Sequence, residues 1–128
     1  MQHSLRSVSD VMRHGVISVS GSTTLDAVAR VMAEHSVHAV LVVADDGDLL
    51  GWVTPRGLLR QRAAQWHHVD AADAVEQPCV PIVPSASVAA AVDALLDGEV
   101  SHLAVMRPGA RTPDGVVSEI DLVAALAR

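Results

Sequence analysis

Ser118 and Asp121 stand three residues apart, where an apolar run that begins at Gly115 gives way to a helical pattern. A serine followed three residues later by an acid is typical of a capping box, which satisfies free N–H groups in the first helical turn. The same groups suit a nucleotide, because the hydroxyl can donate to a phosphate or ribose oxygen and the carboxylate can accept from ribose hydroxyls. A helix N-terminus also favours negative charge. The residues are consistent with either role and with both together.

An earlier stretch has the same frame with one change. Residues 51–57 read GWVTPRG, so Thr54 keeps the hydroxyl while Gly57 stands where the later stretch has Asp121. Without that carboxylate a ribose loses its main anchor. We therefore expect this first site to be weaker, altered or vacant, and we expect a Gly57→Asp change to strengthen it. Arg56 is a candidate for contact with a phosphate, and a solvated surface role is the alternative.

Both stretches belong to an internal repeat. Shifting the chain by 63 positions aligns Asp10 with Asp73, Ser22 with Ser85, Val37 with Val100, and Val42 with Val105. After one extra residue in the second copy, a shift of 64 aligns Gly51 with Gly115 and Thr54 with Ser118. Two copies are too few for a solenoid and favour a pseudo-twofold pair instead.

Each copy has the same order of expected elements. The strands VISV (16–19) and VPIV (80–83) precede polar turns, whose Thr24 and Ser87 are expected to cap amphipathic helices. Continuous apolar strands follow at 39–43 and 102–106, as is typical of strands buried on both faces. A third strand and a closing helix complete each copy. The fold class is therefore α/β (α+β), with two pseudo-symmetric β-α-β-β-α motifs at residues 1–64 and 65–128.

Composition excludes several functions. The 128 residues carry a formal net charge of −6, and the nine basic residues, all of them arginines, form no basic cluster, so nucleic acid is not an expected partner. No apolar run is long enough to span a membrane, and MQHSLRSVSD lacks the apolar stretch of a secretory signal. With the single Cys79, these features predict a cytoplasmic protein. The seven histidines show no metal-ligand spacing, and no nucleophile stands with a base, so we expect neither a metal site nor an enzyme.

The frame V-S-D-V-M (8–12), the apolar strands and the closing G-x-V-[ST]-x-x-D together resemble the cystathionine-β-synthase-type (CBS) domain. Such domains occur as tandem pairs called Bateman modules, and the resemblance covers about Val8 to Leu126. It implies two motifs packed sheet to sheet, with clefts that commonly bind adenosine nucleotides. It also implies a homodimer that regulates a partner enzyme or transporter.

The resemblance also implies a set of binding residues. In the second cleft the base would lie between two strands, and the site would comprise Val80, Pro81, Ile82, His102, Leu103, Ala104, Ser118 and Asp121. The weaker first site would comprise Ile17, Ala39, Val40, Thr54 and Arg56. The arginine and proline that the family often has on its second strand are missing from both copies. That departure favours a monophosphate or a nucleoside-like ligand.

The expected ligand is thus an AMP-like nucleotide or S-adenosylmethionine, bound as a regulatory ligand with no cofactor. The alternative is a purely structural module, in which both clefts have decayed and the chain only dimerises or docks a partner. The small-residue helices at 88–96 and 122–126 would then be its contact surface.

Overall fold

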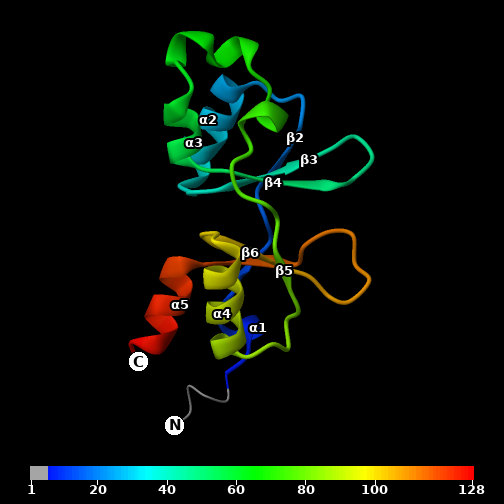
Figure 1. Cartoon of the computed structure of the whole chain (residues 1–128), viewed down its shortest axis with the longest axis vertical. Helices are drawn as coiled ribbons and strands as arrows, with labels where there is room; N and C mark the ends of the chain where they lie inside the picture. The colour runs from blue at the N-terminus through cyan, green and yellow to red at the C-terminus, as the bar shows by residue number, and fades with distance from the viewer. Residues whose placement is uncertain (1–5) are drawn as a thin grey trace. The chain divides into compact units, whose positions relative to one another are not determined.

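The computed structural model describes residues 6–128. Residues 1–5 belong to the expected first motif and to the N-terminal stretch MQHSLRSVSD, and they lie outside the described residues. The chain forms two compact units (Figure 1). Unit 2 comprises Ile17–Cys79, whereas unit 1 comprises Val80–Arg128 together with the N-terminal segment up to Val16. The packing units therefore divide the chain differently from the two sequence copies.

Unit 2 holds a three-stranded sheet in the order β2-β3-β4, with the first pair parallel and the second antiparallel. Its elements are β2 (Ser18–Ser20), α2 (Leu25–His35), β3 (Val40–Val43), β4 (Leu49–Val53), α3 (Pro55–Arg60) and the 3-10 helices η2 (Ala63–His68) and η3 (Ala71–Ala74). An aliphatic cluster contributed by the sheet and its helices forms the core of this unit.

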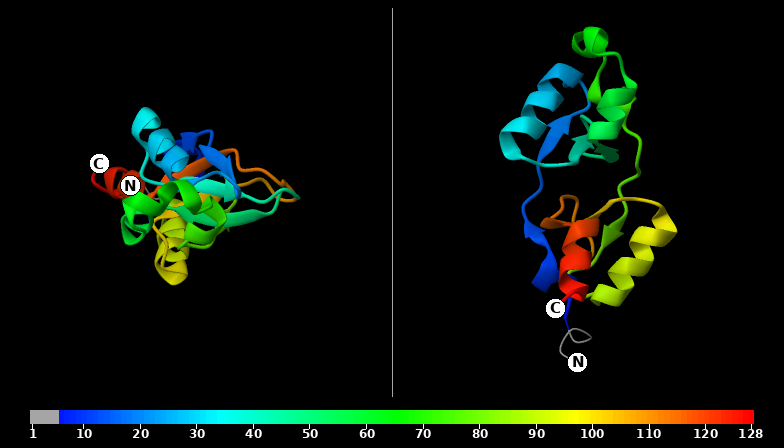
Figure 2. Two further views of the ribbon diagram at one scale, coloured as in Figure 1. Left: turned by 90° about the horizontal axis from the view of Figure 1, so that it is seen from above. Right: turned by 90° about the vertical axis from the view of Figure 1, so that its left-hand side faces the viewer.

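Unit 1 holds a four-stranded sheet in the order β1-β7-β6-β5. Its elements are α1 (Val8–Val11), β1 (Arg13–His14), β5 (Pro81–Ile82), α4 (Val88–Gly98), β6 (His102–Val105), β7 (Gly115–Ser118) and α5 (Glu119–Leu126). In Figure 2 the blue N-terminal segment runs beside the orange-red β7 and α5, in agreement with the antiparallel pairing of β1 with β7. Leu103, Val105 and Val117 of the sheet pack against Val88 and Leu95 of α4.

The strand registers repeat as the sequence predicts. Val19 pairs with Val42 in the parallel pair of unit 2, and Ile82 pairs with Val105 in the parallel pair of unit 1. The two pairings are equivalent, because the shift of 63 aligns Val19 with Ile82 and Val42 with Val105. The predicted α/β fold with two copies of one motif is therefore confirmed, and Val42 and Val105 are both fully buried, as predicted.

Local details differ from the predictions in two places. β2 and β5 are shorter than the predicted strands, although the Ile17 and Val80 carbonyls before them still accept from Leu41 and Ala104 at 3.0 Å. Ser87 caps α4 by accepting from Ala90, but the Thr24 hydroxyl makes no such bond to α2. The nearby Thr24 hydroxyl instead acts on Asp26, where it is the main cause of the lowered pKa of that carboxyl group.

The two sequence copies exchange their leading segments. Equivalent backbone bonds hold each segment in place: Val8 N–H to the Ala86 carbonyl (2.8 Å), Ala71 N–H to Thr23 (2.7 Å), Val88 N–H to Arg6 (3.4 Å) and Leu25 N–H to Val69 (3.0 Å). Because each segment continues along a strand of the unit it joins, Arg13 arrives beside β7. Glu76 arrives beside β4 in the same way, where its N–H bonds to the Trp52 carbonyl.

Candidate functional site

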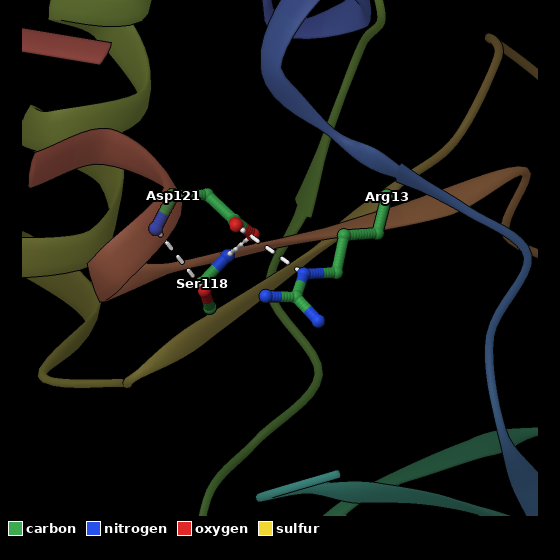
Figure 3. A network of polar contacts seen from close by, with 3 residues as sticks. All are labelled: Arg13, Ser118 and Asp121. Atoms are coloured by element: carbon green, nitrogen blue, oxygen red, sulfur yellow. Dashed lines mark hydrogen bonds and ion pairs between the residues drawn. The ribbon is translucent and has the colours of Figure 1, made fainter. Parts of the chain in front are cut away.

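The second Ser-x-x-Asp stretch forms the N-terminus of α5. Ser118 is the N-cap residue and ends β7. Its N–H donates to Oδ2 of Asp121 at 2.9 Å, and its Oγ accepts from the Asp121 N–H at 3.3 Å (Figure 3). The predicted capping box is therefore present. Because each bond satisfies a free N–H of the first turn, these residues stabilise the start of the helix.

Arg13 completes a group of three side chains at this helix start. Its Nε lies 3.3 Å from Oδ1 of Asp121, as Figure 3 shows. The Asp121 side chain is 12% exposed, whereas that of Arg13 is 66% exposed. An ion pair with one partner this exposed is weak and can be exchanged for another. The guanidinium is thus held near the helix N-terminus and remains accessible to an anion.

The Ser118 hydroxyl retains donor capacity. A hydroxyl has one proton to donate and can accept as well. Ser118 Oγ accepts from Asp121, and within residues 6–128 no acceptor bonds to its proton. The site therefore combines an available hydroxyl donor, an exposed cation and the N-terminal end of an eight-residue helix, all of which favour an anionic oxygen.

The residues expected around an adenine base lie on two paired strands. Pro81 pairs with Ala104, and the Ala104 N–H is already bonded to the Val80 carbonyl. Val80 and Ile82 are partly buried against the core of unit 1, whereas Pro81 is exposed on the edge strand β5. Because proline has no N–H, this strand edge offers few backbone donors to a base.

The side chains of Leu103 and Ala104, which were expected in one binding site, lie on opposite faces of the sheet. It is fully buried within the core cluster of unit 1, whereas Ala104, which is also fully buried, is not part of that cluster. Side chains alternate between the faces of a sheet, so Leu103 can offer only its backbone to a ligand on the face that carries Ala104. His102 lies on the Ala104 face, opposite Ser118 in register, and its Nδ1 is 2.8 Å from the Ser101 hydroxyl.

The first copy has a different arrangement at the matching helix start. Thr54 is buried and caps α3, where its hydroxyl accepts from the Gly57 N–H at 3.3 Å. The Thr54 hydroxyl also donates to Oε1 of Glu76. Oε2 of Glu76 lies 3.9 Å from Arg60 Nη1. Arg56 is exposed and has no hydrogen bond or ion pair within the part of the chain that the structure describes.

The other residues expected at the first site are mostly inaccessible. Val40 is fully buried in the core of unit 2, Ala39 is buried, and Ile17 is partly buried against the same core. Of the five residues expected there, only Arg56 presents an exposed side chain.

Arg13 and Glu76 belong to no recognised motif, and the sequence predicted no role for either residue. A signal was nevertheless present, because the shift of 63 aligns these two residues of opposite charge with each other. The same comparison aligns Asp121 with Gly57. One copy thus has an arginine and an aspartate where the other has a glutamate and a glycine.

Among residues 6–128, no group of three His, Cys, Asp or Glu side chains is placed to hold a metal ion. No helix in this described part is long and apolar enough to cross a membrane. Cys79 is partly buried, and burial raises the pKa of its thiol.

Two strand–helix junctions of this kind, on repeated α/β units, define a tandem module. The family model of the CBS domain matches residues 8–64 and 71–128. Because these matches include most of the chain, the chain belongs to the CBS domain family. The protein MK0525 of Methanopyrus kandleri is 28% identical over 103 residues, which are 78% of this chain and 53% of that protein. The chain thus spans about half the length of that relative.

Solved structures share the fold. The CBS-domain containing protein ATU1752 of Agrobacterium tumefaciens has a TM-score of 0.82 and 23% identity, covering 98% of this chain and 97% of that chain. The CBS domain of a bacterial CNNM/CorC family Mg²⁺ transporter, in complex with ATP, has a TM-score of 0.84 and 15% identity. That match covers 98% of this chain and 90% of the other. At these identities the likeness concerns the fold alone.

Proposed function

We propose that this chain is a regulatory module that binds an adenosine-type ligand at its second CBS copy and thereby controls a partner enzyme or transporter. Tandem CBS domains are commonly regulatory and bind ligands, and the CBS family model matches most of this chain. The transporter domain solved with ATP supports an adenosine nucleotide as the class of ligand. The role is regulatory rather than catalytic.

The observation that carries this proposal is the group formed by Arg13, Ser118 and Asp121. The Ser118 proton would bond to a phosphate or ribose oxygen. Arg13 would leave its exposed ion pair and face the phosphate, which frees Oδ1 of Asp121 for ribose hydroxyls. Oδ2 of Asp121 would remain bonded to the Ser118 N–H, so helix capping and ligand binding coexist.

The ligand is best described as an AMP-like monophosphate or S-adenosylmethionine. Among residues 6–128, Arg13 is the one cation that pairs with a carboxylate at this helix start. The second strand of the copy supplies His102 where relatives of the family often have arginine. An arginine is always protonated, whereas a histidine is not a permanent cation and is therefore the weaker partner for a triphosphate. A single phosphate, or the carboxylate of S-adenosylmethionine, matches this limited positive charge.

Calorimetric titration with adenosine, AMP, ADP, ATP and S-adenosylmethionine tests the proposal. We expect AMP or S-adenosylmethionine to bind with the highest affinity and to raise the melting temperature. Arg13→Gln should lower the affinity for AMP and leave the affinity for adenosine nearly unchanged. Arg107→Gln is the matched control, because the Arg107 side chain is similarly exposed (71%) and pairs with Asp114 at 2.8 Å in the same unit. No binding of any of the five compounds would refute the proposal.

A structural role is the second candidate, and it rests on an exposed apolar surface of unit 1. This α4–α5 surface comprises Leu96, Ile120, Val123 and Leu126, each 58–65% exposed. These side chains lie on two helices that contact each other, and exposed apolar side chains favour association. In unit 2 the positions equivalent to Ile120 and Leu126 are Arg56 and Arg62. We therefore propose that the chain forms a homodimer in which the α4–α5 surfaces of two copies meet about a twofold axis.

Sedimentation of matched variants tests the dimer. Val123→Asp should produce a monomer at concentrations of about ten micromolar, where ordinary interfaces remain associated. Leu59→Asp is the control, since Leu59 is the equivalent residue of unit 2 and is 79% exposed. If wild type is a monomer, or if only Leu59→Asp dissociates it, the α4–α5 surface is not the interface.

A further inference from the structure

The two copies carry their charges in exchanged places. In the second copy the carboxylate, Asp121, belongs to the helix, and the leading strand supplies Arg13. In the first copy the helix has Gly57 instead, and the leading segment supplies Glu76 at the position equivalent to Arg13. Each helix start therefore meets one carboxylate, which comes from a different part of the chain in each copy.

The Glu76 carboxylate occupies the space in which an aspartate at position 57 would begin. A Cβ added to Gly57 would lie 3.1 Å from both Cδ and Oε1 of Glu76. The Glu76 side chain is 18% exposed, and Thr54 beside it is 7% exposed. The carboxylate is thus packed against the start of α3 and is not a solvated surface group.

The two copies differ most clearly in whether the hydroxyl at the helix start still has a proton to donate. Thr54 accepts from the Gly57 N–H and donates its proton to Glu76, so it has none left to donate. Ser118 accepts from the Asp121 N–H, and its proton has no acceptor within residues 6–128. Of the two matching hydroxyls, only that of Ser118 is available to donate to a ligand.

The charges beside the two hydroxyls also favour anion binding at the second copy over the first. A phosphate that approached Thr54 would meet the Glu76 carboxylate, whereas a phosphate that approached Ser118 would meet the Arg13 guanidinium. Displacing Glu76 would break its charge-assisted bond to Thr54, a class of bond about twice as strong as a neutral one. The ion pair with Arg60 adds less, because the Arg60 side chain is 68% exposed.

From this geometry we infer that Glu76 is an internal ligand that closes the first copy, so that each chain binds one adenosine-type ligand, at the second copy. This inference deepens the proposed function and rests on it for the identity of the ligand. Glu76 places a carboxylate at the start of α3. Because the Thr54 hydroxyl donates its proton to Glu76, that hydroxyl cannot donate to an external ligand.

The seating of Glu76 is tested without ligand. Melting temperatures are measured for Thr54→Val, Glu76→Ala and the double variant. Since both single changes remove the same bond, the double variant should lose less than the sum of the single losses. Ser118→Ala combined with Glu76→Ala is the control, and its losses should add because the two residues lie in different units. Additive losses for Thr54 and Glu76 would overturn the inference.

Closure of the first copy is tested by calorimetry with AMP. Wild type should bind one equivalent per chain, Asp121→Ala should lose most of its affinity, and Glu76→Ala should bind a second, weaker equivalent. Two equivalents for wild type, or no gain for Glu76→Ala over a wild type that binds one, would overturn the inference. If wild type binds no AMP, the proposed function fails, and the melting experiment alone decides whether Glu76 is the internal ligand.

Discussion

Replacing Asp121 separates its capping role from its binding role. In Asp121→Ala the Ser118 N–H loses its 2.9 Å acceptor and Arg13 loses its ion pair. Loss of a helix cap costs about 0.5–2 kcal/mol, and an exposed ion pair contributes at most about 1 kcal/mol. We therefore expect a loss of about 1–2 kcal/mol in the free energy of unfolding. Urea denaturation followed by circular dichroism measures it.

Ligand affinity should fall by more than capping explains. Hydrogen bonds to a charged acceptor are worth roughly 1.5–3 kcal/mol, so AMP should bind about ten- to a hundredfold more weakly to Asp121→Ala. Asp121→Asn sharpens the comparison, because an amide oxygen still caps the helix but carries no charge. This variant should keep most of the stability and lose affinity.

The chain contains a matched control for this experiment. Ser7 and Asp10 form a second capping box in unit 1, in which the Ser7 N–H donates to Asp10 Oδ2 at 2.9 Å, the same distance as at α5. Asp10→Ala should lower stability without changing AMP affinity. If Asp121→Ala behaves like Asp10→Ala, with lower stability and unchanged affinity for every ligand, the capping box explains the Ser-x-x-Asp motif and the binding role is refuted.

The remaining predictions concern the first copy and the thiol. Gly57→Asp should destabilise unit 2 by about 1–3 kcal/mol rather than strengthen a first site, because its Cβ would lie 3.1 Å from the Glu76 carboxylate; a smaller loss in the Glu76→Ala background, measured by urea denaturation, is the check. Burial raises the pKa of Cys79 above 9.0, so its stabilising contribution is complete below that pH and is lost as the pH rises through the folded-state value. Cys79→Ser should reduce the fall in melting temperature between pH 8 and pH 10, and an unchanged fall would contradict this account.

The sequence predicted the fold because residues that the repeat makes equivalent occupy equivalent positions in the paired strands of the two units. Equivalent residues such as Val42 and Val105 recur at a fixed spacing, and the pairing of each strand follows the same spacing. Side-chain direction on the central strands could not be predicted in the same way. Strands buried on both faces are apolar throughout, so no alternation in the sequence distinguishes the direction of Leu103 from that of Ala104.

The composition of the site was harder to predict, because it depends on the exchange of leading segments. Periodicity describes contacts near in sequence, whereas Arg13 meets Asp121 across 108 positions. The sequence therefore indicated the hydroxyl and the carboxylate of the helix but not the cation beside them. It indicated the missing carboxylate at Gly57 but not the glutamate that replaces it.

The exchange of segments also explains how each helix start has a carboxylate although only one copy has the aspartate. A helix start that lacks its aspartate has an uncompensated N-terminus, which a carboxylate from another segment can satisfy. Glu76 provides this carboxylate for α3 and bonds to the Thr54 hydroxyl in doing so. The same position in the other copy is then available for Arg13, whose charge suits an anionic ligand. A single repeated position, supplied in each unit by the opposite half of the sequence, thus assigns structural support to the first copy and, as we propose, ligand binding to the second.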